Sequence, residues 1–155
     1  MRPSYTSPCC TWWIDNIYHV HIEEAVLEVL GTERFLAFQR QHTVRLSESS
    51  TMRQLLSGAL TLFGVSPRHL YHLVPRAYNT LCRDAGTPHV VDDGPTRVRM
   101  VYSALPEILV TNACWRLGLV GTLQTMLELT RRKGTVEVTE HDLAGRRVVV
   151  TASWD

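Results

Sequence analysis

The sequence lacks the features of several common protein classes. Its charges nearly cancel, with 16 Lys and Arg against 15 Asp and Glu, so no strong field directs it toward nucleic acid or an acidic membrane surface. No stretch approaches the roughly 20 consecutive apolar residues of a membrane span, and residues 1–5 lack the apolar core of a secretory signal. We therefore expect a cytoplasmic protein with no membrane span and no nucleic-acid partner.

Motifs that mark catalytic and cofactor sites are also missing. The sequence holds no glycine-rich phosphate loop, nucleophile elbow, HExxH pair or CxxC cluster. Cys9, Cys10, Cys82 and Cys114 have neither metal nor disulfide spacing, so we expect reduced thiols. These absences favour a protein that binds rather than catalyses. An enzyme whose catalytic cluster is scattered along the sequence is the alternative.

The N-terminus differs in character from the rest of the chain. Residues 1–16 hold Pro3 and Pro8 and no apolar periodicity, which is typical of an irregular segment. Trp12 and Trp13 within it are costly to leave in water, so we expect at least one to contact the domain, a ligand or a partner. The remainder, residues 17–155, has the length of a single α/β domain.

Apolar spacing predicts helices in the first half and strands in the second. Helices are expected over about 21–30, 32–42, 51–64 and 67–85. After Gly86 the pattern predicts strands at about 89–91 and 97–102, a long helix over 106–132, and strands at 136–139 and 146–154. The predicted fold class is α+β, with a helical N-terminal half packed on a four-stranded, mainly antiparallel ββαββ sheet crossed by the long helix.

The long helix carries most of the predicted core. Trp115 lies in its apolar stripe, so we expect this side chain to anchor the helix on the sheet. Gly118 and Gly121 are expected to allow tight packing between the helix and the sheet.

Histidines and arginines are the candidate site residues. If residues 17–22 were extended, His19 and His21 would face one side and could share a metal; two surface histidines before a helix are the simpler interpretation. His72 lies one turn from His69 on the fourth helix. Arg97 and Arg99 share one strand face, where they could bind an anion or pair with Glu137 or Glu140 on another strand.

Three segments carry a family resemblance: Leu73–Asn79, Val98–Ser103 and Trp115–Leu123. Together they resemble the superfamily of ligand-binding domains in nitric oxide signalling and Golgi transport, which includes haem nitric-oxide-binding domains, four-vinyl-reductase domains and TRAPP subunits. Val29–Phe35 and the Leu55–Gly64 helix are most similar to myxobacterial paralogues of unknown function. The resemblance covers about residues 22–154 and rests on diffuse packing patterns.

The resemblance implies a non-enzymatic sensory or interaction module of bacterial signalling. Such a module would bind a small apolar ligand or a protein partner, with no cofactor, and would form a homodimer through its N-terminal helices. A haem-based gas sensor is the alternative, because haem members place a proximal histidine on the helix before the sheet, where this chain has His72. Haem members also carry a Tyr-x-Ser-x-Arg motif for the propionates, and the stretch Tyr102–Pro106 does not reproduce it.

Overall fold

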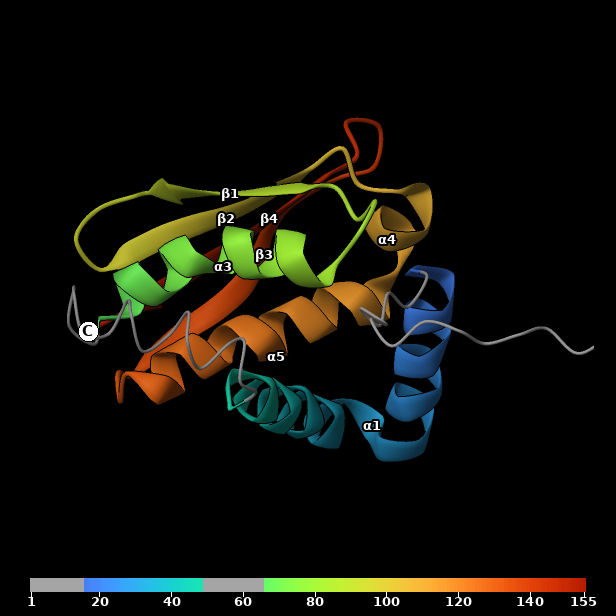
Figure 1. Ribbon diagram of the computed structural model, residues 1–155, viewed down its shortest axis with the longest axis horizontal. Helices are drawn as coiled ribbons and strands as arrows, with labels where there is room; N and C mark the ends of the chain where they lie inside the picture. Colours follow the sequence, from blue (N-terminus) through green and yellow to red (C-terminus); the bar gives the residue numbers. More distant parts are fainter. Residues whose placement is uncertain (1–15, 49–65) are drawn as a thin grey trace, which may run out of the picture.

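A computed structural model describes residues 16–48 and 66–155 of the chain (Figure 1). Within these two ranges the order is two helices, two strands, two helices and two strands. Their bounds are α1 (Asn16–Ser47), α3 (Pro67–Leu81), β1 (Thr87–Asp92), β2 (Arg97–Ser103), α4 (Glu107–Thr111), α5 (Ala113–Leu129), β3 (Gly134–Asp142) and β4 (Arg147–Trp154). No helix in these two ranges is long and apolar enough to cross a membrane.

The four strands form one antiparallel sheet in the order β1-β2-β4-β3. Met100 at the centre of β2 is opposite Val90 of β1 and Val150 of β4. Each hairpin contributes one central and one edge strand, and the helical connection between the hairpins crosses one face. The predicted α+β class with a ββαββ sheet is confirmed.

This strand order bears on the ion-pair partners of Arg97 and Arg99. Since β4 lies between β2 and β3, Arg97 and Arg99 are not on a strand adjacent to the glutamates of β3. Both approach Asp93 in the β1–β2 turn instead, with N···O distances of 3.4 and 3.8 Å. The predicted pairing with Glu137 or Glu140 is therefore wrong, and the arginines belong to the first hairpin.

Helices α3 and α5 cover one face of the sheet (Figure 1). Tyr71 of α3 is fully buried, its ring stacks on Trp154 of β4 at 5.9 Å between centroids, and its hydroxyl donates to the Leu123 carbonyl of α5 at 3.0 Å. A buried hydroxyl is costly without a partner, so this bond fixes the position of α3. One side chain thus joins two helices and the sheet.

Trp115 of α5 lies in the core, as the sequence predicts. It is 5% exposed, and its ring meets Tyr102 of β2 edge to face, with centroids 5.9 Å apart and planes at 81°. Tyr102 in turn meets Tyr78 of α3 at 5.4 Å. This row of three aromatic rings fills the space between α3, α5 and the sheet.

Helix α1 is bent at Gly31, whose φ of 72° and ψ of 167° are not helical. A positive φ of this kind favours glycine. The bend gives two arms, and α1 packs against α5 on the side away from the sheet (Figure 1). A Cβ on Gly118 would lie 3.0 Å from Glu23, and one on Gly121 would lie 3.0 Å from Gln39. The two glycines of α5 therefore serve helix-to-helix packing, and the predicted helix-to-sheet role is wrong.

The predicted long helix is divided at Asn112, which separates α4 from α5. Its φ and ψ of −80° and 116° are extended, and its side-chain oxygen accepts a hydrogen bond from the Trp115 backbone at 2.8 Å. This is the arrangement of an N-cap. The Asn112 amide nitrogen donates to Glu24 of α1 at 2.7 Å.

Several other boundaries also differ from the prediction. Helix α1 begins at Asn16 rather than near residue 21, and α3 ends at Leu81 because Cys82 is extended. The predicted helix over 51–64 lies outside the described residues, as do Trp12 and Trp13.

Candidate functional site

His72 lies on the exposed side of α3, at the edge of the sheet. Its side chain is 46% exposed, and Nε2 is 3.0 Å from Oδ1 of Asp92 on β1. Arg68 of α3 donates to the same oxygen at 2.9 Å. Hydrogen bonds from Arg68 and His72 lower the pKa of the Asp92 carboxyl. The imidazole thus helps to hold α3 on β1.

The Tyr102–Pro106 stretch, which does not reproduce the propionate motif, lies partly in the core. Tyr102 is 1% exposed and lies within the aromatic row, where burial raises its hydroxyl pKa far above the usual range. Ala104 and Pro106 stand where the motif needs a hydroxyl and a cation. In this structure His72 contacts Asp92, and the Tyr102–Pro106 stretch lacks the Ser and Arg of the haem motif.

His19 and His21 both lie in the first arm of α1, which is helical. Residues two apart on a helix do not face each other, so the extended backbone required for a shared metal is not present. His19 lies 3.3 Å from Glu23, and His21 lies 3.2 Å from Glu24. In the described part of the chain, no three His, Cys, Asp or Glu side chains converge as metal ligands.

A buried polar contact joins the two arms of α1. Glu23 is 7% exposed, and its Oε1 accepts a hydrogen bond from Gln39 of the second arm at 2.8 Å. Its Oε2 is buried and has no hydrogen-bond partner among the residues that the structure describes. The hydrogen bond with Glu23 raises the pKa of His19, whereas burial lowers the pKa of His42. Because the Glu23–Gln39 hydrogen bond joins the first arm of α1 to the second, it fixes the angle between the two arms.

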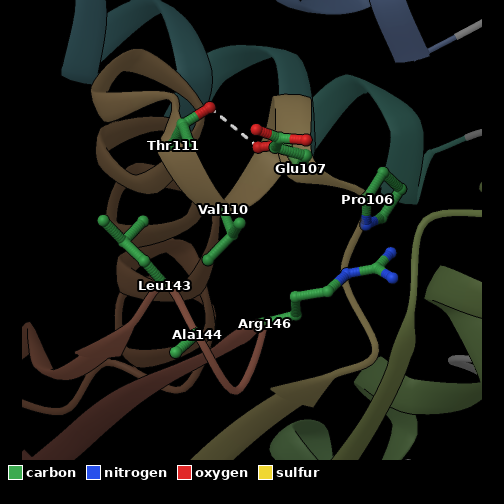
Figure 2. Close-up of a pocket in the computed structure, with 7 residues that line it drawn as sticks. All are labelled: Pro106, Glu107, Val110, Thr111, Leu143, Ala144 and Arg146. Carbon is green, nitrogen blue, oxygen red and sulfur yellow. Dashed lines mark hydrogen bonds between the residues drawn. The ribbon is translucent and has the colours of Figure 1, made fainter.

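A shallow surface cavity of about 640 Å³ lies between α4 and the β3–β4 turn (Figure 2), and five of its seven lining residues are exposed. Its volume is in the range of small-molecule sites. Apolar and polar side chains alternate around it. It is lined by Pro106, Glu107, Val110, Thr111, Leu143, Ala144 and Arg146.

The start of α4 is tied to the β3–β4 turn by paired bonds. The Leu105 amide donates to the Arg146 carbonyl at 3.1 Å, and the Arg146 side-chain Nε donates to the Leu105 carbonyl. Ala104 and Arg146 both have left-handed backbones, with φ of 51° and 50°. Such conformations are unfavourable for residues other than glycine and are held only by their surroundings. The two hydrogen bonds between Leu105 and Arg146 therefore hold this wall of the cavity in one conformation.

The end of α4 is tied to the same hairpin. The Val110 carbonyl accepts a hydrogen bond from Arg116 of α5 at 2.8 Å and lies 2.7 Å from Nε2 of His141 on β3. Burial lowers the pKa of Arg116. Both ends of α4 are held against the hairpin, so the cavity between them is formed by the fold itself.

The sequence predicted the two segments that line this cavity, but it did not predict that they lie side by side. It placed a helix start at Pro106 and Glu107 and a turn at Leu143–Gly145. Nothing in either segment indicates that the two meet, because they are separated by a helix and a strand. The left-handed conformation of Arg146 also has no signature in the sequence.

Comparison with known proteins relates this arrangement to one fold. No protein-family model matches the sequence, and no curated protein matches it. Solved structures of H-NOX domains do match: an oxygen-binding H-NOX domain related to soluble guanylate cyclases, in its oxygen complex, has a TM-score of 0.63 at 14% identity, over 97% of this chain and 78% of that chain.

Two further H-NOX structures agree. One, from a study of haem distortion in the H-NOX family, has a TM-score of 0.63 at 13% identity, over 97% of this chain and 78% of that one. A mutant of T. tengcongensis H-NOX has a TM-score of 0.57 at 16% identity, over 92% and 75%. The chain therefore has the H-NOX fold. This agrees with the fold that the resemblance implies, whereas the superfamily and the more specific resemblance to myxobacterial paralogues stay predictions.

Proposed function

We propose that the chain is a non-enzymatic sensory module that binds a small ligand in the cavity beside α4. The observation that carries this proposal is the cavity itself, held at both ends of α4 by bonds to the β3–β4 hairpin. A concave surface lined by both apolar and polar side chains is a usual place for a small ligand to bind. The fold supports a sensory role, because one of the matched H-NOX structures is an oxygen complex.

The chemistry of the cavity favours binding over catalysis. Among the described residues that line it, the ionisable groups are the carboxylate of Glu107 and the guanidinium of Arg146. Thr111 uses its hydroxyl to donate to the Glu107 backbone carbonyl at 2.7 Å, so it is not paired with a general base. A guanidinium keeps its proton at neutral pH. These groups can hold a ligand but form no nucleophile and base pair.

Amide NMR of the intact protein with a panel of small aliphatic probes tests the proposal. We expect probe-induced shifts confined to residues 105–111 and 143–146. Ala144→Phe fills the cavity and should abolish them, whereas Ala37→Phe, at an exposed alanine on α1, should leave them unchanged. Shifts that persist in Ala144→Phe, or that map elsewhere, would refute the site.

Haem binding is the second candidate, favoured by the likeness to H-NOX structures. The positions of His72 and Tyr102 argue against it. Protein purified from haem-supplied cells should show no Soret band. A Soret band that His72→Ala abolishes would make haem the ligand and reverse the order of the two candidates.

Self-association is proposed through the first arm of α1. Tyr18 and Ile22 lie one turn apart on it and are 67% and 55% exposed, and apolar side chains gathered in this way commonly mark a contact surface. Light scattering should show a homodimer, and Tyr18→Glu should convert it to a monomer. A monomer mass at high protein concentration would contradict the proposal.

A further inference from the structure

The first arm of α1, residues 16–30, lies beside α4 and α5 and is joined to the second arm by a hinge (Figure 1). Gly31 at the junction has a positive φ and is exposed, and a Cβ there would meet no atom within 4 Å. Glycine adopts new backbone angles at little steric cost, and the open space around it lets the chain turn. The contacts between the first arm and its neighbours therefore decide how firmly the arm is held.

One of these contacts is a buried carboxylate. Glu23 is 7% exposed, and its Oε1 lies 2.8 Å from the amide nitrogen of Gln39 and 3.3 Å from Nε2 of His19. Its Oε2 is buried without a hydrogen-bond partner among the described residues. A Cβ on Gly118 would lie 3.0 Å from Oε1, so the backbone of α5 borders the same space. A carboxylate in these surroundings is costly to bury, because its charge is incompletely paired.

His19 supplies the compensating charge. Its hydrogen bond with Glu23 raises the pKa of the imidazole above the ordinary value of 6.5, against the opposing effect of burial. The stabilisation from this pair is present below the ordinary pKa and is lost as the pH rises through the folded value. At higher pH the carboxylate keeps only neutral donors, the Gln39 amide among them. The closed position of the first arm is therefore less favourable at higher pH.

The other groups around the carboxylate keep their charge state over this range. On the second arm, burial and the charge of His19 lower the pKa of His42, so His42 is neutral where His19 titrates. The neighbouring guanidinium of Arg45 keeps its proton. Burial raises the pKa of the Cys114 thiol in α5 and of the Cys82 thiol after α3 to about 11. Among the described residues of this cluster, His19 is therefore the group whose charge changes near neutral pH.

We propose that the first arm of α1 is a pH-controlled flap, closed on α5 when His19 is protonated and swinging out about Gly31 when the imidazole loses its proton. Opening brings the buried carboxylate into water and uncovers Val20, which is 1% exposed in the closed arm. It also separates Glu24 from Asn112, whose side chains lie 2.7 Å apart in the closed arm. This regulatory device is distinct from the ligand cavity.

Amide hydrogen exchange of the intact protein, followed by NMR and corrected for the intrinsic effect of pH, measures the opening of the arm. We expect the protection of residues 20–27 to fall between about pH 6.5 and pH 8.5, relative to that of residues 35–43 in the second arm. The side chain of His19 is 48% exposed, so solvent screens part of its charge. The fall should therefore be about threefold to tenfold, as for one partly screened charge-assisted contact.

Three variants assign the effect to the buried pair. His19→Gln should hold the arm at its high-pH protection at both pH values, and Glu23→Gln should remove the pH dependence, because no buried charge remains. His21→Gln is the matched control, since His21 lies on the same arm but contacts Glu24, at 3.2 Å, instead of Glu23. It should keep the pH dependence of the parent. Both histidines are exposed, so neither replacement disturbs the core.

Three results would overturn the proposal. The first is a protection of the first arm that does not change with pH in the parent. The second is a pH dependence that survives in His19→Gln or disappears in His21→Gln. The third is an equal fall of protection in both arms, which would mean that the charge of His19 acts on the stability of the whole domain and not on the position of the first arm.

Discussion

Replacing Trp115 with alanine tests the packing on which the whole arrangement depends. The side chain is 5% exposed and meets Tyr102 edge to face. Truncating a buried tryptophan costs about 3–5 kcal/mol through lost burial and the cavity left behind. A change of this size should lower the melting temperature of a domain of this length by about 6–20 °C. This loss of free energy is a large share of the typical total stability of about 5–15 kcal/mol.

Urea unfolding followed by far-ultraviolet circular dichroism measures this loss. Because urea slopes for small proteins are about 1–3 kcal/mol per molar, the midpoint should fall by at least about 1 M. Glu33→Ala is the control, since that side chain is exposed on the second arm of α1 and surface changes usually stay within about 0.5 kcal/mol. Equal midpoints for Trp115→Ala and the parent would refute the placement of α5 on the sheet.

Three other perturbations probe different contacts. Gly118→Val forces Glu23 to move, because a Cβ there lies 3.0 Å from its Oε1; stability should fall by about 1–3 kcal/mol, and an unchanged urea midpoint would argue against close packing of α1 on α5. Glu23 raises the pKa of His19 in the folded state, so their contact stabilises below the ordinary histidine pKa of 6.5 and is lost as pH rises through the folded value; urea midpoints should show the advantage of the parent over Glu23→Gln shrinking with rising pH, and a constant difference would contradict this. Asp92→Asn weakens the exposed contact with Arg68, so it should shift the urea midpoint far less than Trp115→Ala; a comparable shift would show that this contact is more than a surface pair.

Periodicity was sufficient to predict most of the fold. Alternation in Val98–Tyr102 and helical spacing around Trp115 both reflect burial on one face, and burial is what the structure shows. The strand order was not predictable, because apolar alternation is the same for a central and an edge strand. That is why the prediction of partners for Arg97 and Arg99 was wrong: the alternation placed them on a polar face but could not say which strand lies beside it.

The candidate site was harder to predict because its residues are distant in sequence. His72 was a reasonable haem candidate by position, yet a helix periodicity does not say whether a histidine meets a pocket or a neighbouring carboxylate such as Asp92. The cavity depends on the contact between Leu105 and Arg146. Neither residue has a motif, so the only available signals were a helix start and a turn.

The division of the predicted long helix at Asn112 has a mechanical consequence. This one side chain caps α5 with its oxygen and holds Glu24 of α1 with its nitrogen, while its backbone ends α4. The cavity wall, the core helix and the outer helix therefore meet at a single amide. Any displacement of α4 that turns this amide breaks one bond or the other, so a movement of α4 is coupled to its contacts with both α1 and α5 at this point.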